Sequence, residues 1–377
     1  MKILSILGTR PEAIKMAPVI RLLNADPRFQ SIVCVTAQHR QMLDQALELF
    51  QIKPDFDLNL MRPNQSLPAL TAAALEALDP LLTQTRPDWI LAQGDTTTVM
   101  AAALMAYYHK IRFGHVEAGL RTGDKFAPFP EEINRRLAGV MADLHFAPTD
   151  WARQNLLREG VPAEKILVTG NTVIDALRWA AEQPFDPDSL LPLGLNLPAI
   201  EAAGRQIVLV TAHRRENFGA PLEAIFRAIL SLAQHRLGQT EFIYPVHLNP
   251  QVQEPAYRIL SGQPNIHLIA PLDYLPLINV LKRASLALTD SGGLQEEAPG
   301  LGVPVLVLRE VTERPEGIAA GTVRLVGADP QKIEETSLLL LTSPAEHAKM
   351  ARAANPYGDG HAAERILAAL SAWRAAA

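Results

Sequence analysis

The chain has 377 residues, of which 48% are hydrophobic and 20% charged, and its formal net charge at pH 7 is -5. This length is too great for one comfortable core and predicts two domains. The weakly acidic balance excludes a basic face for nucleic acid or an anionic membrane, so a local cluster of basic groups has to hold any anionic ligand. A single cysteine excludes an internal disulfide.

Apolar stretches in the sequence are short. None reaches the roughly 18 uninterrupted residues that a membrane helix needs. The apolar run at the N-terminus is too brief for a signal peptide and ends in a turn. A cytoplasmic protein without a membrane partner is therefore expected.

Short apolar runs alternate with longer amphipathic stretches, which is typical of strand–helix units on a parallel sheet. In the first half, strands are predicted at Ile3–Leu7, Ile32–Thr36, Trp89–Gln93, Phe113–Glu117, His145–Pro148 and Ile166–Thr169. Helices are predicted over Thr71–Thr85 and Thr98–His109. In the second half, strands are predicted at Ile207–Thr211, Phe242–Val246, Ile266–Ala270, Leu286–Thr289 and Val305–Leu308.

A proline-rich segment at 183–198 interrupts this alternation. Its four prolines disfavour a regular helix and predict a linker between domains. The sequence therefore predicts two doubly wound Rossmann-like α/β domains, 1–182 and 199–360, that face each other across a cleft. The helix-forming stretch at the C-terminus, 361–377, is expected to return to the first domain.

Functional side chains in such domains belong just after the carboxyl ends of strands. The first candidate is the segment 8–15, GTRPEAIK, where a glycine turn before a helix suits an anion and where Arg10 and Lys15 add positive charge. An ordinary strand-to-helix turn with a surface arginine is the alternative. The segment is not Gly-x-Gly-x-x-Gly, which disfavours a tightly docked dinucleotide.

Three carboxylates follow later strands of the first half. Asp95 comes directly after one strand, where capping the next helix is the commonest use of an aspartate. Glu117 ends an apolar strand, and a buried acid there needs a partner or a function, with an ion pair to Arg121 as the structural alternative. Glu131 starts a helix on the same face as Arg135, although a first-turn glutamate often only offsets the helix dipole.

The second half places cations and glycines after its strands. His213 is followed by Arg214 and another arginine, a pattern that indicates phosphate contact more than a lone structural histidine does. The segment 290–297, DSGGLQEE, exposes backbone amides at a helix start, which suits a diphosphate, with a glutamate for ribose hydroxyls. Arg314 follows the next strand. The 10 histidines show no metal-ligand spacing, so no metal is expected.

Together these motifs resemble one family, the bacterial non-hydrolysing UDP-N-acetylglucosamine 2-epimerases. The matching strings run in order through both halves: GTRPEAIKMAP, QHRQMLDQ, GDTTT, GHVEAGLRTG, PFPEEINRR, VTGNTVIDAL, TAHRRENFG, YPVHLNP, DSGGLQEEAP, TERPEG and NPYGDG. The resemblance implies the GT-B fold of two-domain glycosyltransferases, a homodimer and no cofactor.

The resemblance also implies a reaction, the reversible conversion of UDP-N-acetylglucosamine to UDP-N-acetylmannosamine. C2 of the sugar has no activating carbonyl, and the missing dinucleotide fingerprint disfavours a transient oxidation. The remaining route expels UDP from C1, which acidifies the C2 proton. A carboxylate removes that proton to give 2-acetamidoglucal, and UDP adds back after reprotonation on the other face.

Site roles carry over from the family motif by motif. The resemblance implies acid–base roles for Asp95, Glu117 and Glu131 and a catalytic role for His213. It assigns nucleotide-sugar contacts to Arg10, Lys15, Arg135, Arg214, Ser291, Gly292, Gly293, Glu297 and Arg314. A second substrate molecule is expected to act as an activator at Gln38 and Gln41, near Asn64, where some members carry an arginine.

Some positions depart from the family pattern. Gln93 stands where many members have a histidine, and Leu272 and Leu277 stand where some present Gln and Phe to uracil. Two alternatives remain open at this point. A GT-B glycosyltransferase shares the nucleotide site but needs only one base, and a nucleotide-sugar sensor would bind the same ligand without catalysis.

Overall fold

The computed structural model describes residues 1–36, 40–62 and 65–376. The chain forms two compact units, Met1–Ala176 with Tyr357–Ala377, and Leu177–Pro356. Helix α7 (Thr172–Glu182) begins in the first unit and ends in the second. The segment 183–198, expected as a linker, belongs to the second unit and contains a 3-10 helix, η2 (Pro187–Leu193).

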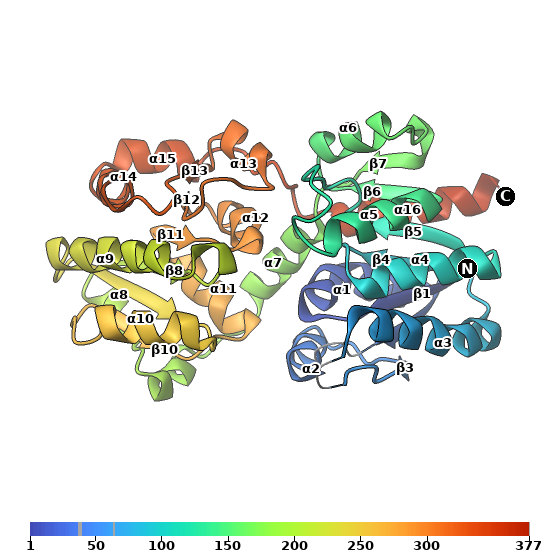
Figure 1. Cartoon of the computed structure of the whole chain (residues 1–377), viewed down its shortest axis with the longest axis horizontal. Helices are drawn as coiled ribbons and strands as arrows, with labels where there is room; N and C mark the ends of the chain where they lie inside the picture. Colours follow the sequence, from blue (N-terminus) through green and yellow to red (C-terminus); the bar gives the residue numbers. More distant parts are fainter. Residues whose placement is uncertain (37–39, 63–64, 377) are drawn as a thin grey trace. The chain divides into compact units, whose positions relative to one another are not determined.

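The first unit is built on a seven-stranded parallel sheet with the order β3-β2-β1-β4-β5-β6-β7 (Figure 1). Its strands are β1 (Lys2–Leu7), β2 (Gln30–Val35), β3 (Phe56–Asp57), β4 (Trp89–Gln93), β5 (Arg112–Val116), β6 (Leu144–Ala147) and β7 (Ile166–Val168). The sequence located every one except β3, which is too short to show a periodic pattern. The strand order reverses between β1 and β4, which sets the place where the segments following these strands can diverge around a ligand.

Helices follow most strands of the first unit. They are α1 (Arg10–Ala25), α2 (Arg40–Leu49), α3 (Leu67–Thr85), α4 (Thr97–His109), α5 (Glu131–Met141), α6 (Asp150–Arg158), η1 (Ala163–Lys165) and α16 (Ala362–Ala376). The C-terminal α16 packs on α1. Its Trp373 contacts Trp89 of β4 edge-on, with ring centroids 5.5 Å apart. The expected return of this helix to the first domain is confirmed.

The second unit repeats the plan with a six-stranded parallel sheet in the order β10-β9-β8-β11-β12-β13. Its strands are β8 (Gln206–Thr211), β9 (Thr240–Pro245), β10 (Ile266–Ile269), β11 (Leu286–Thr289), β12 (Val305–Val307) and β13 (Val323–Leu325), the last of which the sequence did not reveal. Its helices are α8 (Leu197–Ala202), η3 (Arg215–Asn217), α9 (Ala220–His235), α10 (Pro250–Leu260), α11 (Tyr274–Arg283), α12 (Gly292–Gly300), α13 (Pro315–Ala320), α14 (Pro330–Thr342) and α15 (Pro344–Ala351).

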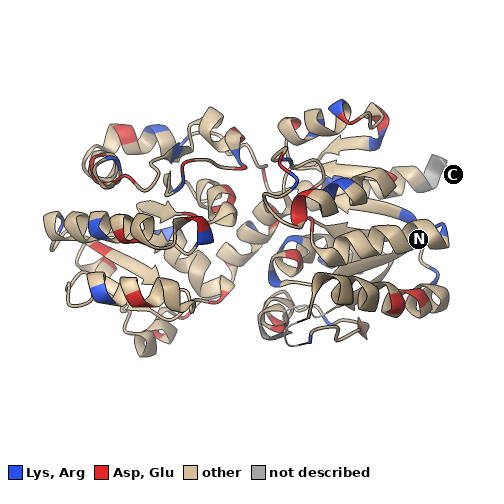
Figure 2. Ribbon diagram, in the orientation of Figure 1, with Lys and Arg blue, Asp and Glu red and all other residues tan. Residues whose placement is uncertain are grey.

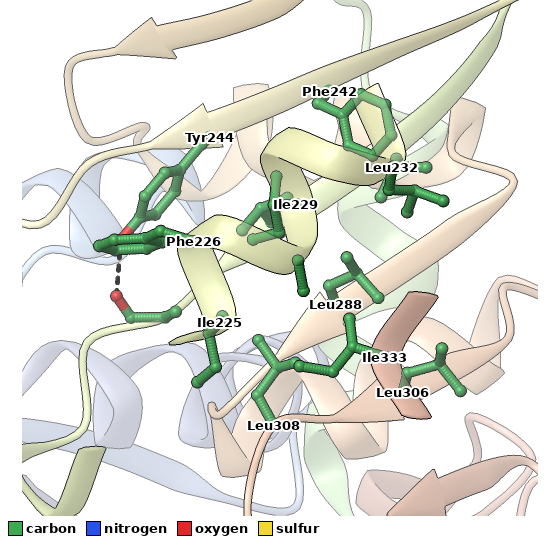
Figure 3. Packing of buried hydrophobic residues seen from close by; sticks show 14 of the residues in the cluster. Ile225, Phe226, Ile229, Leu232, Phe242, Tyr244, Leu288, Leu306, Leu308 and Ile333 are labelled. Carbon is green, nitrogen blue, oxygen red and sulfur yellow. Dashed lines mark hydrogen bonds between the residues drawn. The ribbon is translucent and has the colours of Figure 1, made fainter. Parts of the chain in front are cut away.

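The core of the second unit lies between α9 and its sheet (Figure 3). Phe226 of α9 packs against Tyr244 of β9 with ring centroids 5.7 Å apart. The buried Tyr244 hydroxyl donates a 2.6 Å hydrogen bond to the carbonyl of Ala212, directly after β8. Because burial of a large apolar side chain stabilises by about 1.5–3 kcal/mol, this packing holds the carboxyl ends of β8 and β9 firmly together.

Both units are α/β structures on parallel sheets, which confirms the predicted fold class. Lys and Arg are interspersed with Asp and Glu along the helices of each unit (Figure 2). Within the described ranges, no helix is long and apolar enough to cross a membrane.

Candidate active site

Glu117 is the most constrained carboxylate of the first unit. It follows β5 with φ +62°, a left-handed conformation that is rare for a residue with a side chain. Lys15 of α1 and Gln93 of β4 both donate to its carboxylate, and the Asn171 amide donates from 2.9 Å. Three segments of the chain therefore fix this buried side chain. The strain and the convergent donors together are typical of a functional site.

Asp95 lies next to Glu117, at the end of the neighbouring strand β4. Its carboxylate forms an ion pair with Arg135 of α5, which also contacts Glu132 at 3.5 Å. Burial raises the pKa of Asp95; the Arg135 charge opposes this shift and the Glu117 charge adds to it. A carboxyl group with a raised pKa can take up and return a proton closer to neutral pH.

Glu131 opens α5 one turn before Arg135, so the two residues share a face of the helix. Since Arg135 reaches Asp95, this face of α5 is turned to the site. Among the residues that the structure describes, Glu131 has no ion-pair partner. The alternative pairing of Glu117 with Arg121 is wrong, because Arg121 binds Glu159 through two hydrogen bonds of 2.8 and 2.7 Å.

The first turn of α1 contains a residue that the sequence analysis missed. Glu12 is buried and accepts hydrogen bonds from the backbone amides of Gly8 and Thr9 and from the Thr96 hydroxyl at 2.5 Å. The amides that were expected to approach an anion are thus engaged by a carboxylate of the same chain. Burial is the main cause that raises the pKa of Glu12 to about 7. The Thr-x-x-Glu pattern at Thr9–Glu12 is a capping box and could have revealed it.

In the second unit the strand order reverses between β8 and β11, and polar residues follow both strands. Asp290, after β11, is fully buried and accepts hydrogen bonds of 2.8 Å from the backbone amides of His213 and Arg214. The His213 ring stacks on the ring of His247, which follows β9, with centroids 5.1 Å apart. Burial lowers the pKa of His213, and the Asp290 charge works against this shift.

The predicted glycine-rich helix start is present in α12. Ser291 is its N-cap residue and Gly292 and Gly293 form its first turn. The Ser291 side chain makes no capping hydrogen bond. Arg314 lies against this turn, because a Cβ added to Gly292 would stand 2.9 Å from the guanidinium carbon, and Glu296 holds the arginine with a 2.8 Å hydrogen bond.

Glu297 lies one turn farther along α12 and is buried. Tyr274 is the first residue of α11, and its hydroxyl donates a 2.8 Å hydrogen bond to the Glu297 carboxylate. Leu272 is buried just before α11, and Leu277 is half-buried within it. Tyr274 was not predicted, since nothing local in the sequence links it to a glutamate on another helix.

The predicted activator residues are not described fully. Gln38 and Asn64 lie outside the described residues, and Gln41 is placed only as part of α2. Arg10 is the first residue of α1 and Arg214 precedes η3. Over the described ranges, no three His, Cys, Asp or Glu side chains gather as metal ligands.

Comparison with known proteins gives a context to these two groups of residues, one in each unit. The family model described as UDP-N-acetylglucosamine 2-epimerase matches residues 21–371. The chain belongs to the UDP-N-acetylglucosamine 2-epimerase family. A UDP-N-acetylglucosamine 2-epimerase from Salmonella typhimurium is 54% identical over 375 residues, which cover 99% of each chain.

Solved structures of other family members agree over the full length. The epimerase of Neisseria meningitidis, solved bound to UDP-GlcNAc, is 49% identical and has a TM-score of 0.90, with 98% of this chain and 99% of that chain covered. The epimerase of Methanocaldococcus jannaschii, solved with UDP-GlcNAc and UDP, is 34% identical and has a TM-score of 0.80. The match covers 98% of this chain and 99% of that chain. The family resemblance of the motifs and the assignment to the isomerases are confirmed.

Proposed function

We propose that the chain inverts C2 of UDP-N-acetylglucosamine by anti elimination of UDP and re-addition. The C1–O bond breaks and its electron pair leaves with the diphosphate, while a carboxylate takes the C2 proton and a C1–C2 double bond forms. Return of a proton to the opposite face of C2 and re-addition of UDP to C1 complete the inversion. Atoms and charge balance without an oxidant.

The observation that carries this proposal is a pair of carboxylates at adjacent strand ends, buried at Glu117 and half-buried at Asp95. Asp95 and Glu117 follow β4 and β5, and the face of α5 that bears Glu131 is turned to them through the Asp95–Arg135 ion pair. An epimerase needs groups that remove a proton from one face and return it to the other, so more than one carboxylate is useful. A glycosyltransferase needs one base and leaves the others unexplained.

We assign the departing UDP to the second unit. The first turn of α12 presents backbone amides at Gly292 and Gly293, with Arg314 against them. Amides and cations that are already in place stabilise the charge that develops on the leaving diphosphate. Glu297, held by Tyr274, is the proposed ribose contact.

An assay without an acceptor separates this function from its alternatives. UDP-N-acetylglucosamine alone should give a mixture with UDP-N-acetylmannosamine, and the same mixture should form from the product. A glycosyltransferase gives no product without an acceptor, and a sensor gives none at all. Release of free N-acetylmannosamine would show instead that the chain hydrolyses its substrate and does not add UDP back.

We propose a homodimer and activation by substrate as further properties. Helix α5 carries an exposed apolar stripe formed by Ile133, Leu137 and Val140. This stripe offers a surface for a second copy of the chain. Light scattering should give twice the mass of 41.2 kDa.

Activation by substrate is tested with UDP-N-acetylmannosamine alone. Its rates should show a lag that added UDP-N-acetylglucosamine removes; linear rates without stimulation would contradict activation.

A further inference from the structure

The second unit contains a buried carboxylate oxygen that its structural role does not explain. Asp290 uses one oxygen, Oδ2, to accept from the amides of His213 and Arg214 and from the Asn217 side chain at 3.2 Å. These bonds hold the loop that follows β8 to the carboxyl end of β11. The other oxygen, Oδ1, is equally buried and has no hydrogen-bond donor among the described residues. Leaving a carboxylate oxygen buried without a donor is costly.

An imidazole nitrogen, His213 Nδ1, faces this oxygen. His213 Nδ1 lies 3.7 Å from Asp290 Oδ1, while the histidine side chain keeps 36% of its surface exposed. The ring is held flat against His247, with 13° between the two planes. Because Nδ1 faces the buried carboxylate, Nε2 lies on the opposite side of the ring, away from Asp290.

We propose that Asp290 is a positioning residue: it orients His213 so that the imidazole becomes protonated and contacts the diphosphate of bound UDP. The carboxylate holds Nδ1–H, so that Nε2 is free to take a proton when the diphosphate arrives and to donate it as a hydrogen bond to a phosphate oxygen. This rests on the proposed function and deepens it, because a charged donor is worth most when negative charge develops on the leaving group.

The charges around the ring give this arrangement a direction. Burial, His247 and Arg214 lower the pKa of His213, whereas Asp290 raises it. Without a ligand the ring is therefore biased to its neutral form. A bound diphosphate adds negative charge on the Nε2 side, and with Asp290 on the other side the imidazolium becomes favourable. Binding of UDP should accordingly take up a proton.

The test is UDP binding by calorimetry at pH 7.5 in buffers of different ionisation enthalpy, which counts the protons exchanged. The wild type should take up about one proton more per UDP than His213→Asn. Asp290→Asn preserves an oxygen for the three donors and places an amide beside Nδ1, so it should lose most of this uptake. Its Kd for UDP should rise about 10-fold at pH 7.5, and the deficit should shrink at lower pH, where the ring protonates without help.

Three further variants distinguish an effect of Asp290 through His213 from a general loss of structure. His247→Phe retains a stacked ring and removes a group that lowers the His213 pKa, so it should shift the imidazole titration, followed by NMR, to higher pH. Asp143→Asn removes a carboxylate that accepts the Phe113 amide in the other unit and should leave UDP binding unchanged. In a His213→Asn background, Asp290→Asn should weaken UDP binding by less than about 2-fold.

Two results would overturn the inference. One is equal proton uptake in Asp290→Asn and the wild type; the other is an equal loss of UDP affinity from Asp290→Asn with and without His213. If Asp290→Asn does not fold, equal proton uptake in the wild type and His213→Asn has the same force. Since UDP binding needs no turnover, a chain that fails to epimerise would contradict the proposed function and leave these outcomes readable.

Discussion

Replacement of Glu12 by glutamine should stabilise the protein, with an effect that grows as pH rises. The isostere can keep all three contacts, since its oxygen can accept from the Gly8 and Thr9 amides and its amide can donate to Thr96. What it removes is the charge. Burial raises the pKa of Glu12 from 4.5 to about 7, so the folded state holds this proton more tightly than the unfolded chain does.

The sign follows from that difference in proton affinity. Below pH 4.5 both states are protonated and the folded protein has its full stability from this group. As pH rises towards 7, the unfolded chain loses its proton first and the folded state is progressively destabilised. With 1.36 kcal/mol for each pKa unit, the penalty is about 1 kcal/mol at pH 5 and about 3 kcal/mol at pH 8.

Urea unfolding of wild type and Glu12→Gln at pH 5, 6, 7 and 8 measures this penalty as the difference in unfolding free energy. The variant should gain about 1 kcal/mol at the lowest pH and about 3 kcal/mol at the highest. Glu132→Gln is the contrasting control, because Glu132 is also buried but binds Arg135 and Arg136, and its loss should destabilise. A Glu12→Gln gain that does not vary with pH would mean that the charge of Glu12 is not what destabilises the folded state.

Three further changes test individual contacts. Gly119→Ala should destabilise by about 3 kcal/mol in urea unfolding, because φ is +92° and the added Cβ would stand 2.3 Å from a carbonyl oxygen of α6. Gly292→Ala should raise the KM for UDP-N-acetylglucosamine about 10-fold, since the added Cβ displaces Arg314 from the amides of α12. Tyr274→Phe should raise the same KM about 5-fold through loss of its hydrogen bond to Glu297.

Matched controls accompany these changes. Gly123 also has a positive φ, +85°, but open space around its Cβ position, so Gly123→Ala should cost only about 1 kcal/mol. Tyr257 is exposed, and Tyr257→Phe should leave the KM unchanged. Equal costs for the two glycine variants, or an unchanged KM for Gly292→Ala or Tyr274→Phe, would contradict the contacts assigned to them.

Most of the fold could be read from the sequence because parallel strands buried on both faces form apolar runs. That pattern located β4 and β11 with their observed ends. It missed β3 and β13, which have two and three residues and are held by pairing with a neighbour. The contact of Trp373 with Trp89 joins residues far apart in the chain, and no local pattern specifies it.

The candidate site was predictable in position but not in pairing. Asp95 and Glu117 follow apolar runs, so their place at one sheet edge follows from the topology. Their partners come from elsewhere: Lys15 from α1 and Arg135 from α5. Charge alone suggested Arg121 for Glu117, yet the fold gives Arg121 another partner. Which ion pairs form depends on tertiary contacts that residue spacing does not encode.

Elimination and re-addition of UDP require exchange of the C2 proton with solvent, which an incubation in deuterated water detects. UDP-N-acetylglucosamine is incubated with the protein, and C2 is followed by proton NMR in both nucleotide sugars. Deuterium should appear at C2 of every UDP-N-acetylmannosamine molecule formed and, gradually, in the remaining substrate. Product that retains its original C2 proton would contradict the mechanism, and the absence of product would contradict the function.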